Sequence, residues 1–282
     1  MGGVWGPYRH AMVQGLHLNE GGKSFVGALL DYIVESHPNY LGLVKIVIRD
    51  AEVELTPSQV KMRALEKLEN LLCTMQEQRQ LPSIDFLTKD IHVMPHFHGN
   101  RSPLADPEMR GMISGISTVP LNTRKLIEEL IYKSDQTVCE EEDQSFESLA
   151  LLYLSTVQSL AYGTKHIIEE MNKEGHKIDR IFMCGGLSKN TLFVNQHANA
   201  TQLPIFRMND REDAMLLGSA VLSSVTAGIY KDTLNAMKHM CHLDRTRDVH
   251  PNPVSLTYHT KKYHVYREMI RDYTKYRSIM ND

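Results

Sequence analysis

The order of patterns between residues 149 and 228 most constrains the fold of this chain. Apolar side chains recur at helical spacing from Leu149 to Met171, and a short apolar run follows at 178–184. Gly185-Gly186 ends that run, and a second helix start, a second apolar run at 203–208 and an apolar helix at 214–227 follow. Alternation of helices and short buried strands predicts an α/β fold with right-handed crossovers.

The rest of the chain predicts helices and loops. Thr56-Pro57 is typical of a helix N-cap with proline in the first turn, and apolar side chains share one face of that helix as far as Met75. Residues 1–22 contain six glycines and predict a loop, whereas 91–94 predict a short strand. Residues 96–107 form a polar loop with glycine and prolines, a kind of segment that often carries function. Residues 229–282 are expected to be mainly helical.

Composition excludes several classes of protein. Lys and Arg number 31 against 34 Asp and Glu in 282 residues, so the net charge of −3 argues against a nucleic-acid partner. The longest uncharged stretches, 149–164 and 214–230, are shorter than a typical membrane span, and the N-terminus lacks the pattern of a signal peptide. The four cysteines form no CxxC pair, which favours reduced thiols. We therefore expect a cytoplasmic protein with no membrane partner.

Two motifs that suggest a ligand are set aside. Gly22-Lys23-Ser24 resembles the end of a P-loop, but that motif requires a glycine five residues earlier, where this chain has His17. The P-loop is therefore rejected, while a glycine turn that faces a phosphate stays open as an interpretation of this segment. The histidines 92, 96 and 98 lie close together, yet no carboxylate or cysteine motif accompanies them. A loop role is favoured, and no metal site is expected.

Gly185-Gly186 is the strongest candidate for a binding site. A strand that ends in two glycines lets a ligand approach the backbone, because no Cβ intervenes. The helix that begins after them offers unpaired N–H groups to a polar or anionic ligand. A tight turn between strand and helix without any ligand has the same spacing, so both interpretations stay open at this point.

Three groups of residues in this order resemble the C-terminal half of the FGGY carbohydrate kinase family. They are Gly99-Asn100-Arg101-Ser102-Pro103 with Asp106-Pro107, Arg110-Gly111 and Gly115; Cys184–Asn190; and Asp213 with Gly218-Ser219-Ala220. Residues 4–8, 18–22 and the tail 261–282 are similar to its ribulokinase-like branch. Lys23 departs from that branch, which usually has glutamine there.

The resemblance implies the fold and the activity. It implies the C-terminal lobe of an actin-like ATPase (ribonuclease H-like), with a mixed sheet flanked by helices. Residues 1–230 would form the nucleotide-binding domain, with an insertion at 118–143, and 231–282 a helical extension. Such kinases transfer the γ-phosphoryl group of ATP to a sugar hydroxyl with Mg²⁺, here of a pentulose such as D-ribulose.

The resemblance also implies the site residues. Gly185, Gly186 and Asn190 would line the adenosine pocket, Gly21 and Gly22 would face the phosphates, and Asp213 is the family's acidic residue before a helix. No catalytic residue is expected, because the aspartate base lies in an N-terminal lobe that this sequence does not contain. A truncated, non-catalytic product that binds a nucleotide or a partner is the alternative. An uncovered lobe interface would favour self-association.

Overall fold

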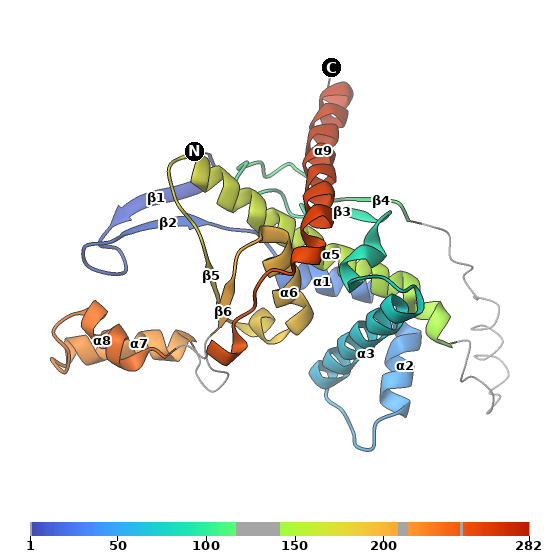
Figure 1. The fold of residues 1–282 in the computed structure, drawn as a ribbon, viewed down its shortest axis with the longest axis horizontal. Helices are drawn as coiled ribbons and strands as arrows, with labels where there is room; N and C mark the ends of the chain where they lie inside the picture. Colours follow the sequence, from blue (N-terminus) through green and yellow to red (C-terminus); the bar gives the residue numbers. More distant parts are fainter. Residues whose placement is uncertain (1, 117–141, 208–213, 243–244, 282) are drawn as a thin grey trace. The chain divides into compact units, whose positions relative to one another are not determined.

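The computed structural model describes residues 2–116, 142–207, 214–242 and 245–281. The chain divides into two compact bodies, coloured by sequence position in Figure 1. The first body comprises Met1–Val26, Pro95–Met112 and Gln158–Asp282, and the second comprises Gly27–Met94 and Ile113–Val157. Helix α5 (Glu142–Lys173) contributes its second half to the first body and its first half to the second.

An antiparallel hairpin opens the first body. Strand β1 (Val4–Arg9) pairs with β2 (His17–Gly21), and the register shifts between Trp5 and Tyr8. Gly6 lies inside this irregularity with a φ of +105°, and a Cβ there would lie 2.5 Å from the carbonyl oxygen of Leu18. The prediction of a loop over 1–22 was wrong, because some of the glycines that suggested it serve the bulge of a hairpin.

A parallel strand pair lies at the centre of the predicted alternation. Strands β5 (Ile181–Met183) and β6 (Ile205–Arg207) pair in parallel, with the short 3₁₀ helix η2 (Gly186–Lys189) and helix α6 (Thr191–Thr201) between them in sequence. Val194 and Ala198 of α6 pack on Ile205 in a fully buried cluster. The strands, the glycine pair and the helix therefore fall where the sequence predicts them.

Three further helices complete the first body. They are α7 (Ala214–Thr226), α8 (Thr233–Met240) and α9 (Leu256–Asn281), with the 3₁₀ turns η3 (Arg245–Arg247) and η4 (Pro253–Ser255) between α8 and α9. Gly228 ends α7 in the left-handed region with φ +73°, and Ile229 N donates to Ser224 O at 2.9 Å. This hydrogen bond is typical of a Schellman cap and fits the expected helix end.

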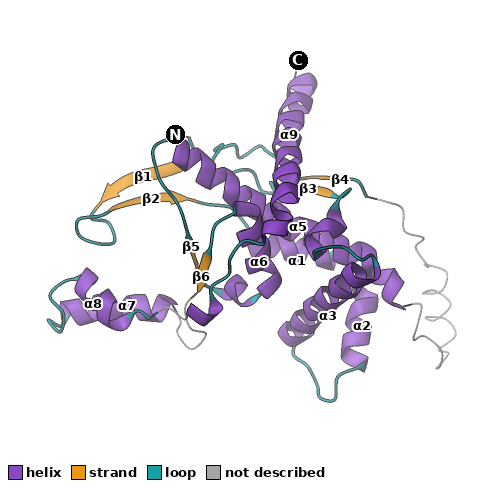
Figure 2. Cartoon of the chain, in the orientation of Figure 1, coloured by secondary structure: helices purple, strands orange, loops and turns teal. Residues whose placement is uncertain are grey.

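The second body is mainly helical (Figure 2). It contains α1 (Val26–Glu35), α2 (Tyr40–Arg49), α3 (Pro57–Gln78), the 3₁₀ helix η1 (Ile84–Thr88) and the strand pair β3 (His92–Met94) and β4 (Met112–Ser114). Thr56 caps α3 in a capping box with Gln59, as its sequence predicts. Apolar side chains of these helices and of the first half of α5 form its core: Leu30, Ile33, Leu43, Val47, Leu68, Leu72, Met75, Leu149, Tyr153 and Leu154.

Two sequence-based boundaries stay predictions. Residues 118–141 of the expected insertion lie outside the described residues, and residues 142 and 143 begin α5. The proposed division at residue 230 separates α7 from α8, whereas the first compact body includes both helices. Among the described residues, no helix is both long enough and apolar enough to cross a membrane.

Candidate functional site

The end of the β1–β2 hairpin is fixed against the loop at 95–112, both within the first body. Gly22 N donates a hydrogen bond of 2.8 Å to Ser102 Oγ, and the Ser102 hydroxyl donates to the Gly3 carbonyl oxygen. Arg101 pairs with Glu20 at 3.0 Å. A Cβ on Gly3 would lie 2.7 Å from the Arg101 carbonyl oxygen, so the two segments cross at backbone contact. This packing places the Gly21-Gly22 turn beside Arg101 and Ser102.

The loop itself is closed by its own hydrogen bonds. Asn100 and Asp106 exchange two backbone hydrogen bonds of 2.8 Å, and Asn100 Oδ1 accepts from Leu104 N at 3.0 Å. Gly99 has a φ of +77°, and a Cβ there would lie 2.8 Å from the Pro107 carbonyl oxygen. Several motif residues that suggested the family therefore shape the loop.

Helix α9 holds the other side of this loop. The Tyr266 hydroxyl lies 3.1 Å from His96 Nε2, and the Tyr273 hydroxyl donates to the Glu108 carbonyl oxygen at 3.1 Å. Arg277 forms an ion pair of 2.9 Å with Asp106. Three contacts along about three turns of one helix thus anchor the loop at His96, Asp106 and Glu108.

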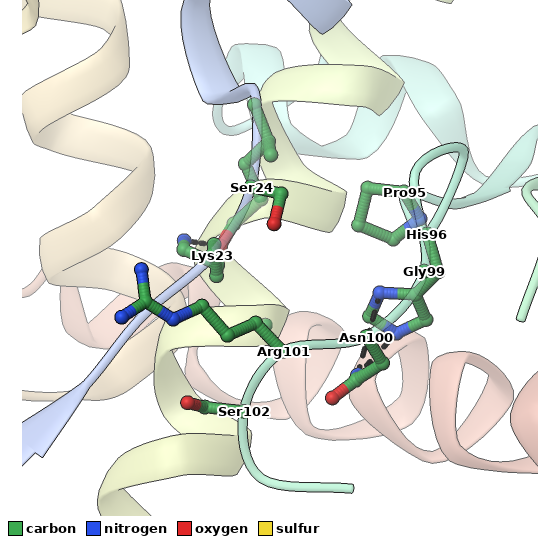
Figure 3. Close-up of a pocket in the computed structure, with 10 residues that line it drawn as sticks. Lys23, Ser24, Pro95, His96, Gly99, Asn100, Arg101 and Ser102 are labelled. Atoms are coloured by element: carbon green, nitrogen blue, oxygen red, sulfur yellow. Dashed lines mark hydrogen bonds between the residues drawn. The ribbon is translucent and has the colours of Figure 1, made fainter. Parts of the chain in front are cut away.

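A pocket lies where the hairpin end, the loop and α5 meet (Figure 3). The space amounts to about 320 Å³ only when the open solvent at its mouth is included, and its enclosed part has room for about one water molecule. Lys23, Ser24, the loop and α5 supply its lining: Lys23, Ser24, Pro95, His96, Gly99, Asn100, Arg101, Ser102, Leu160 and Gly163. None of these side chains is acidic, and Lys23 and Arg101 supply positive charge.

The amine of Lys23 is buried, although the residue as a whole is only partly buried. Nζ donates to the Leu160 carbonyl oxygen and to Thr164 Oγ1, each at 2.6 Å. Burial lowers the Lys23 pKa from 10.5 to about 7, because the charged form loses its hydration. Burial, with the nearby charges of His166 and Lys23, also lowers the His96 pKa to about 3. The imidazole of His96 is therefore neutral at physiological pH.

The Gly185–Asn190 turn forms a second group of candidate residues. Gly185 has a φ of +87°, and its carbonyl oxygen accepts from both the backbone N–H and the hydroxyl of Ser188, at 3.1 and 2.7 Å. Asn190 caps α6 by accepting from Phe193 N at 2.6 Å. A Cβ on Gly185 or Gly186 would meet no atom within 4 Å. Hydrogen bonds therefore hold this turn, and Gly185 and Gly186 are both exposed.

The structure thus places the predicted site residues in two separate turns. Gly21 and Gly22 end β2, whereas Gly185, Gly186 and Asn190 connect β5 to α6. Asp213 lies outside the described residues. The sequence did not identify the pocket around Lys23, although the glutamine expected at that position and the partial P-loop pattern both marked it as unusual.

Comparison with known families identifies the class of protein. The FGGY family of carbohydrate kinases, C-terminal domain, matches residues 2–227. The chain belongs to this family, as the motifs at 99–115 and 184–190 predicted.

Curated relatives match between 80% and 99% of the chain. It is 35% identical over 284 residues to the human FGGY carbohydrate kinase domain-containing protein, covering 99% of this chain and 44% of that protein. The zebrafish (Danio rerio) protein of the same description is 37% identical over 280 residues, with 99% and 44% covered. D-ribulokinase YDR109C of Saccharomyces cerevisiae is 34% identical over 225 residues, with 80% and 27% covered. The chain spans less than half the length of these relatives.

Solved sugar kinases share the fold. The xylulose kinase of Rhodospirillum rubrum superposes with a TM-score of 0.53 at 15% identity, over 89% of this chain and 38% of that one. Plasmodium falciparum glycerol kinase, solved with ADP, gives a TM-score of 0.53 at 13% identity, again over 89% and 38%. These likenesses confirm the expected α/β fold of an actin-like sugar-kinase lobe.

Proposed function

We propose that this chain is the C-terminal, nucleotide-binding domain of an ATP-dependent kinase for a pentulose of the D-ribulose type. Its membership of the FGGY family and its 34% identity to a yeast D-ribulokinase support this proposal. In such a reaction the γ-phosphoryl group passes from ATP to a sugar hydroxyl, and the protein contributes mainly by positioning and by electrostatic stabilisation.

The open turn at Gly185-Gly186 carries the proposal. The N–H groups of Gly186 and Leu187 donate to no acceptor among the described residues, and Gly185 and Gly186 are both exposed. A nucleotide could therefore approach the backbone closely, which a β-carbon would prevent. We assign the adenosine to Gly185, Gly186 and Asn190. The phosphates are assigned to the Gly21-Gly22 turn, since the adjoining pocket carries positive charge and no carboxylate.

Mg²⁺ belongs to the proposal only as a companion of ATP. The described residues contain no group of three or more His, Cys, Asp or Glu side chains that would hold a metal ion. In this proposal the phosphate oxygens of ATP supply ligands for Mg²⁺, which prefers oxygen donors. The assignment of Asp213 to the nucleotide site stays a prediction.

Substitution of Gly186 by valine tests the adenosine site. Because a Cβ at 186 would meet no atom of the described residues within 4 Å, Gly186→Val should fold normally and yet block the nucleotide. We expect at least about tenfold weaker ATP binding by calorimetry. Gly218→Val is the matched control, since residue 218 in α7 also has open space around it, and its ATP affinity should be unchanged. Equal ATP affinity of wild type and Gly186→Val would show that the assignment is wrong.

A turnover assay with D-ribulose distinguishes the domain of an active kinase from the non-catalytic alternative. We assign phosphoryl transfer to a protein that also carries an N-terminal lobe, because the chain spans 44% of its human relative. The 282-residue chain should then bind ATP without phosphorylating D-ribulose. Turnover of D-ribulose by this chain alone would contradict that assignment. ATP binding without turnover in any longer form would favour the non-catalytic alternative.

Self-association is a further expectation of the sequence. On α7 the side chains of Met215, Leu216 and Leu222 are all more than half exposed. Apolar patches of this kind favour association between copies. Light scattering after size-exclusion chromatography would show a mass of 32.2 kDa for a monomer and a multiple of it otherwise.

A further inference from the structure

We propose that the pocket beside Lys23 binds a phosphate group, and that the Lys23 amine takes up a proton when it does so. Two sources share this chemistry: free orthophosphate and the terminal phosphate of a nucleotide. In the second form the inference deepens the function proposed above and rests on it.

The surroundings of the amine lack a negative charge. Both acceptors of Lys23 Nζ, the Leu160 carbonyl oxygen and Thr164 Oγ1, are uncharged. A protonated amine has three N–H groups, so one remains after these two hydrogen bonds. Within the part of the chain that the structure describes, no carboxylate lies within ion-pair distance of Nζ. A buried cation without a counter-ion is unfavourable, and an anion in the pocket would relieve that cost.

The remaining pocket wall offers donors suited to an oxyanion. Ser24 lines the pocket, and its hydroxyl has no hydrogen-bond partner among the described residues. Arg101 uses one terminal nitrogen for Glu20 and keeps further N–H groups on its guanidinium. Ser102 is already engaged by Gly22 and Gly3, so it fixes the wall. Figure 3 shows Lys23, Ser24 and Arg101 among the residues that line the pocket. Guanidinium and ammonium groups are the usual protein partners of phosphate.

The neighbouring titratable groups leave Lys23 as the group that responds near neutral pH. From the loop, His96 has a pKa of about 3, and from α6, His197 also has a pKa of about 3, both chiefly because of burial. His166 on α5 has a pKa lowered to about 4, mainly by burial. These imidazoles are neutral at pH 7. The amine of Lys23, with a pKa near 7, is half protonated there.

The affinity for the anion should fall as the pH rises. A bound dianion favours the protonated amine and raises its pKa above 7. At pH 6 the amine is already protonated and binding takes up few protons. At pH 8 most molecules must gain a proton on binding, so affinity should be about tenfold lower than at pH 6.

Sulfate is the first probe, because it stays a dianion throughout this pH range. Calorimetric titration of the full chain at pH 6 and pH 8, one unit either side of the Lys23 pKa, in two buffers of different ionisation heat, measures affinity and proton uptake together. We expect binding at both pH values and uptake approaching one proton at pH 8 only. Absence of sulfate binding by wild type, or binding without proton uptake at pH 8, would overturn the inference.

Four variants test whether sulfate binding and proton uptake take place at this pocket. Lys23→Gln should lower sulfate affinity at least about tenfold at pH 6 and abolish proton uptake, whereas Lys23→Arg should keep affinity and lose the pH dependence. Lys165→Gln is the control, because Lys165 is also partly buried on α5 but pairs with Glu169 at 3.3 Å. Ser24→Ala should weaken binding a few-fold, which keeps the test valid if Lys23→Gln fails to fold. Wild-type affinity in both Lys23→Gln and Ser24→Ala would contradict the site.

The source of the phosphate group is decided by competition. If the terminal phosphate of a nucleotide occupies the pocket, ATP displaces sulfate and AMP does not. If only orthophosphate occupies it, orthophosphate displaces sulfate and ATP has no effect. Gly186→Val should lose ATP and keep sulfate, so failure of the adenosine site and failure of the anion site give different results.

Discussion

At the scale of the residue, Gly163 explains how the Lys23 side chain crosses α5. A Cβ at 163 would lie 3.2 Å from Lys23 Cδ and 3.7 Å from the Tyr266 hydroxyl. Glycine inside a helix costs about 1 kcal/mol relative to alanine. The lysine therefore crosses α5 at the one point where the helix has no side chain, and the low helix propensity of glycine is offset by that packing.

Gly163→Ala should show coupling to Lys23. In wild type the methyl group gains helix propensity but crowds a lysine that is anchored at its amine, so little net change in unfolding free energy is expected. In a Lys23→Ala background the crowding is gone, and Gly163→Ala should stabilise by about 0.5–1 kcal/mol. Urea unfolding of the four proteins measures the cycle. The same effect of Gly163→Ala in both backgrounds would show that the lysine does not explain the glycine.

The two candidate regions differ in how far the sequence predicts them. The turn at Gly185 and Gly186 was predictable, because a glycine pair at the end of an apolar run is a local signal. The environment of Lys23 was not, since its two hydrogen-bond acceptors lie 137 and 141 residues further along the chain. Burial of an amine depends on which distant segments pack over it.

At the scale of the element, α9 ties the loop at 95–112 through the Arg277–Asp106 ion pair. The hydrogen bond from Arg277 is the main cause that holds the Asp106 pKa below its ordinary value of 3.8. A lowered carboxyl pKa stabilises the fold above the unfolded value and loses that contribution as pH falls through the folded value. The pair should therefore matter at neutral pH and cease to matter in acid.

Arg277→Gln tests this element. It should lower the free energy of unfolding at pH 7 only slightly, because the pair is partly exposed and solvent screens it. The difference from wild type should shrink as pH falls below 3.8. Urea unfolding at pH 7 and pH 3 measures it. A difference that does not change with pH would assign the effect of Arg277 to packing.

The N-terminus of α3 offers a second test within one helix. Thr56 accepts from Gln59 N at 3.4 Å, and the Gln59 side chain accepts from Thr56 N at 2.9 Å. Thr56→Ala should cost about 1 kcal/mol of unfolding free energy. Thr74→Ala, an exposed position inside the same helix, should be neutral or slightly stabilising. Equal effects of the two substitutions would contradict the capping role.

The sequence predicts elements that depend on local signals better than elements that depend on strand pairing. The start of α3 was predicted at its residue, because a cap depends on neighbours three positions away. The β1–β2 hairpin was missed, since its strands pair in an irregular register and expose most of their side chains, which removes the alternation of apolar residues.

At the scale of the whole molecule, the order of motifs predicted more than any single element did. Helix–strand alternation gave the α/β class, and the motifs at 99–115 and 184–190 gave the family that residues 2–227 match. The composition of the first body was not predictable, because it gathers segments 1–26, 95–112 and 158–282 from three parts of the chain. Only tertiary packing defines that set.

The central claim is that ATP binds this chain at the Gly185–Asn190 turn. Backbone amide NMR spectra of the labelled chain, recorded as ATP is added, test it most directly. ATP should shift the amide signals of Gly185 and Gly186 and of Gly21 and Gly22, and Gly175, an equally exposed glycine with φ +97°, should not move. Saturation with ATP that leaves the signals of Gly185 and Gly186 in place would contradict the claim.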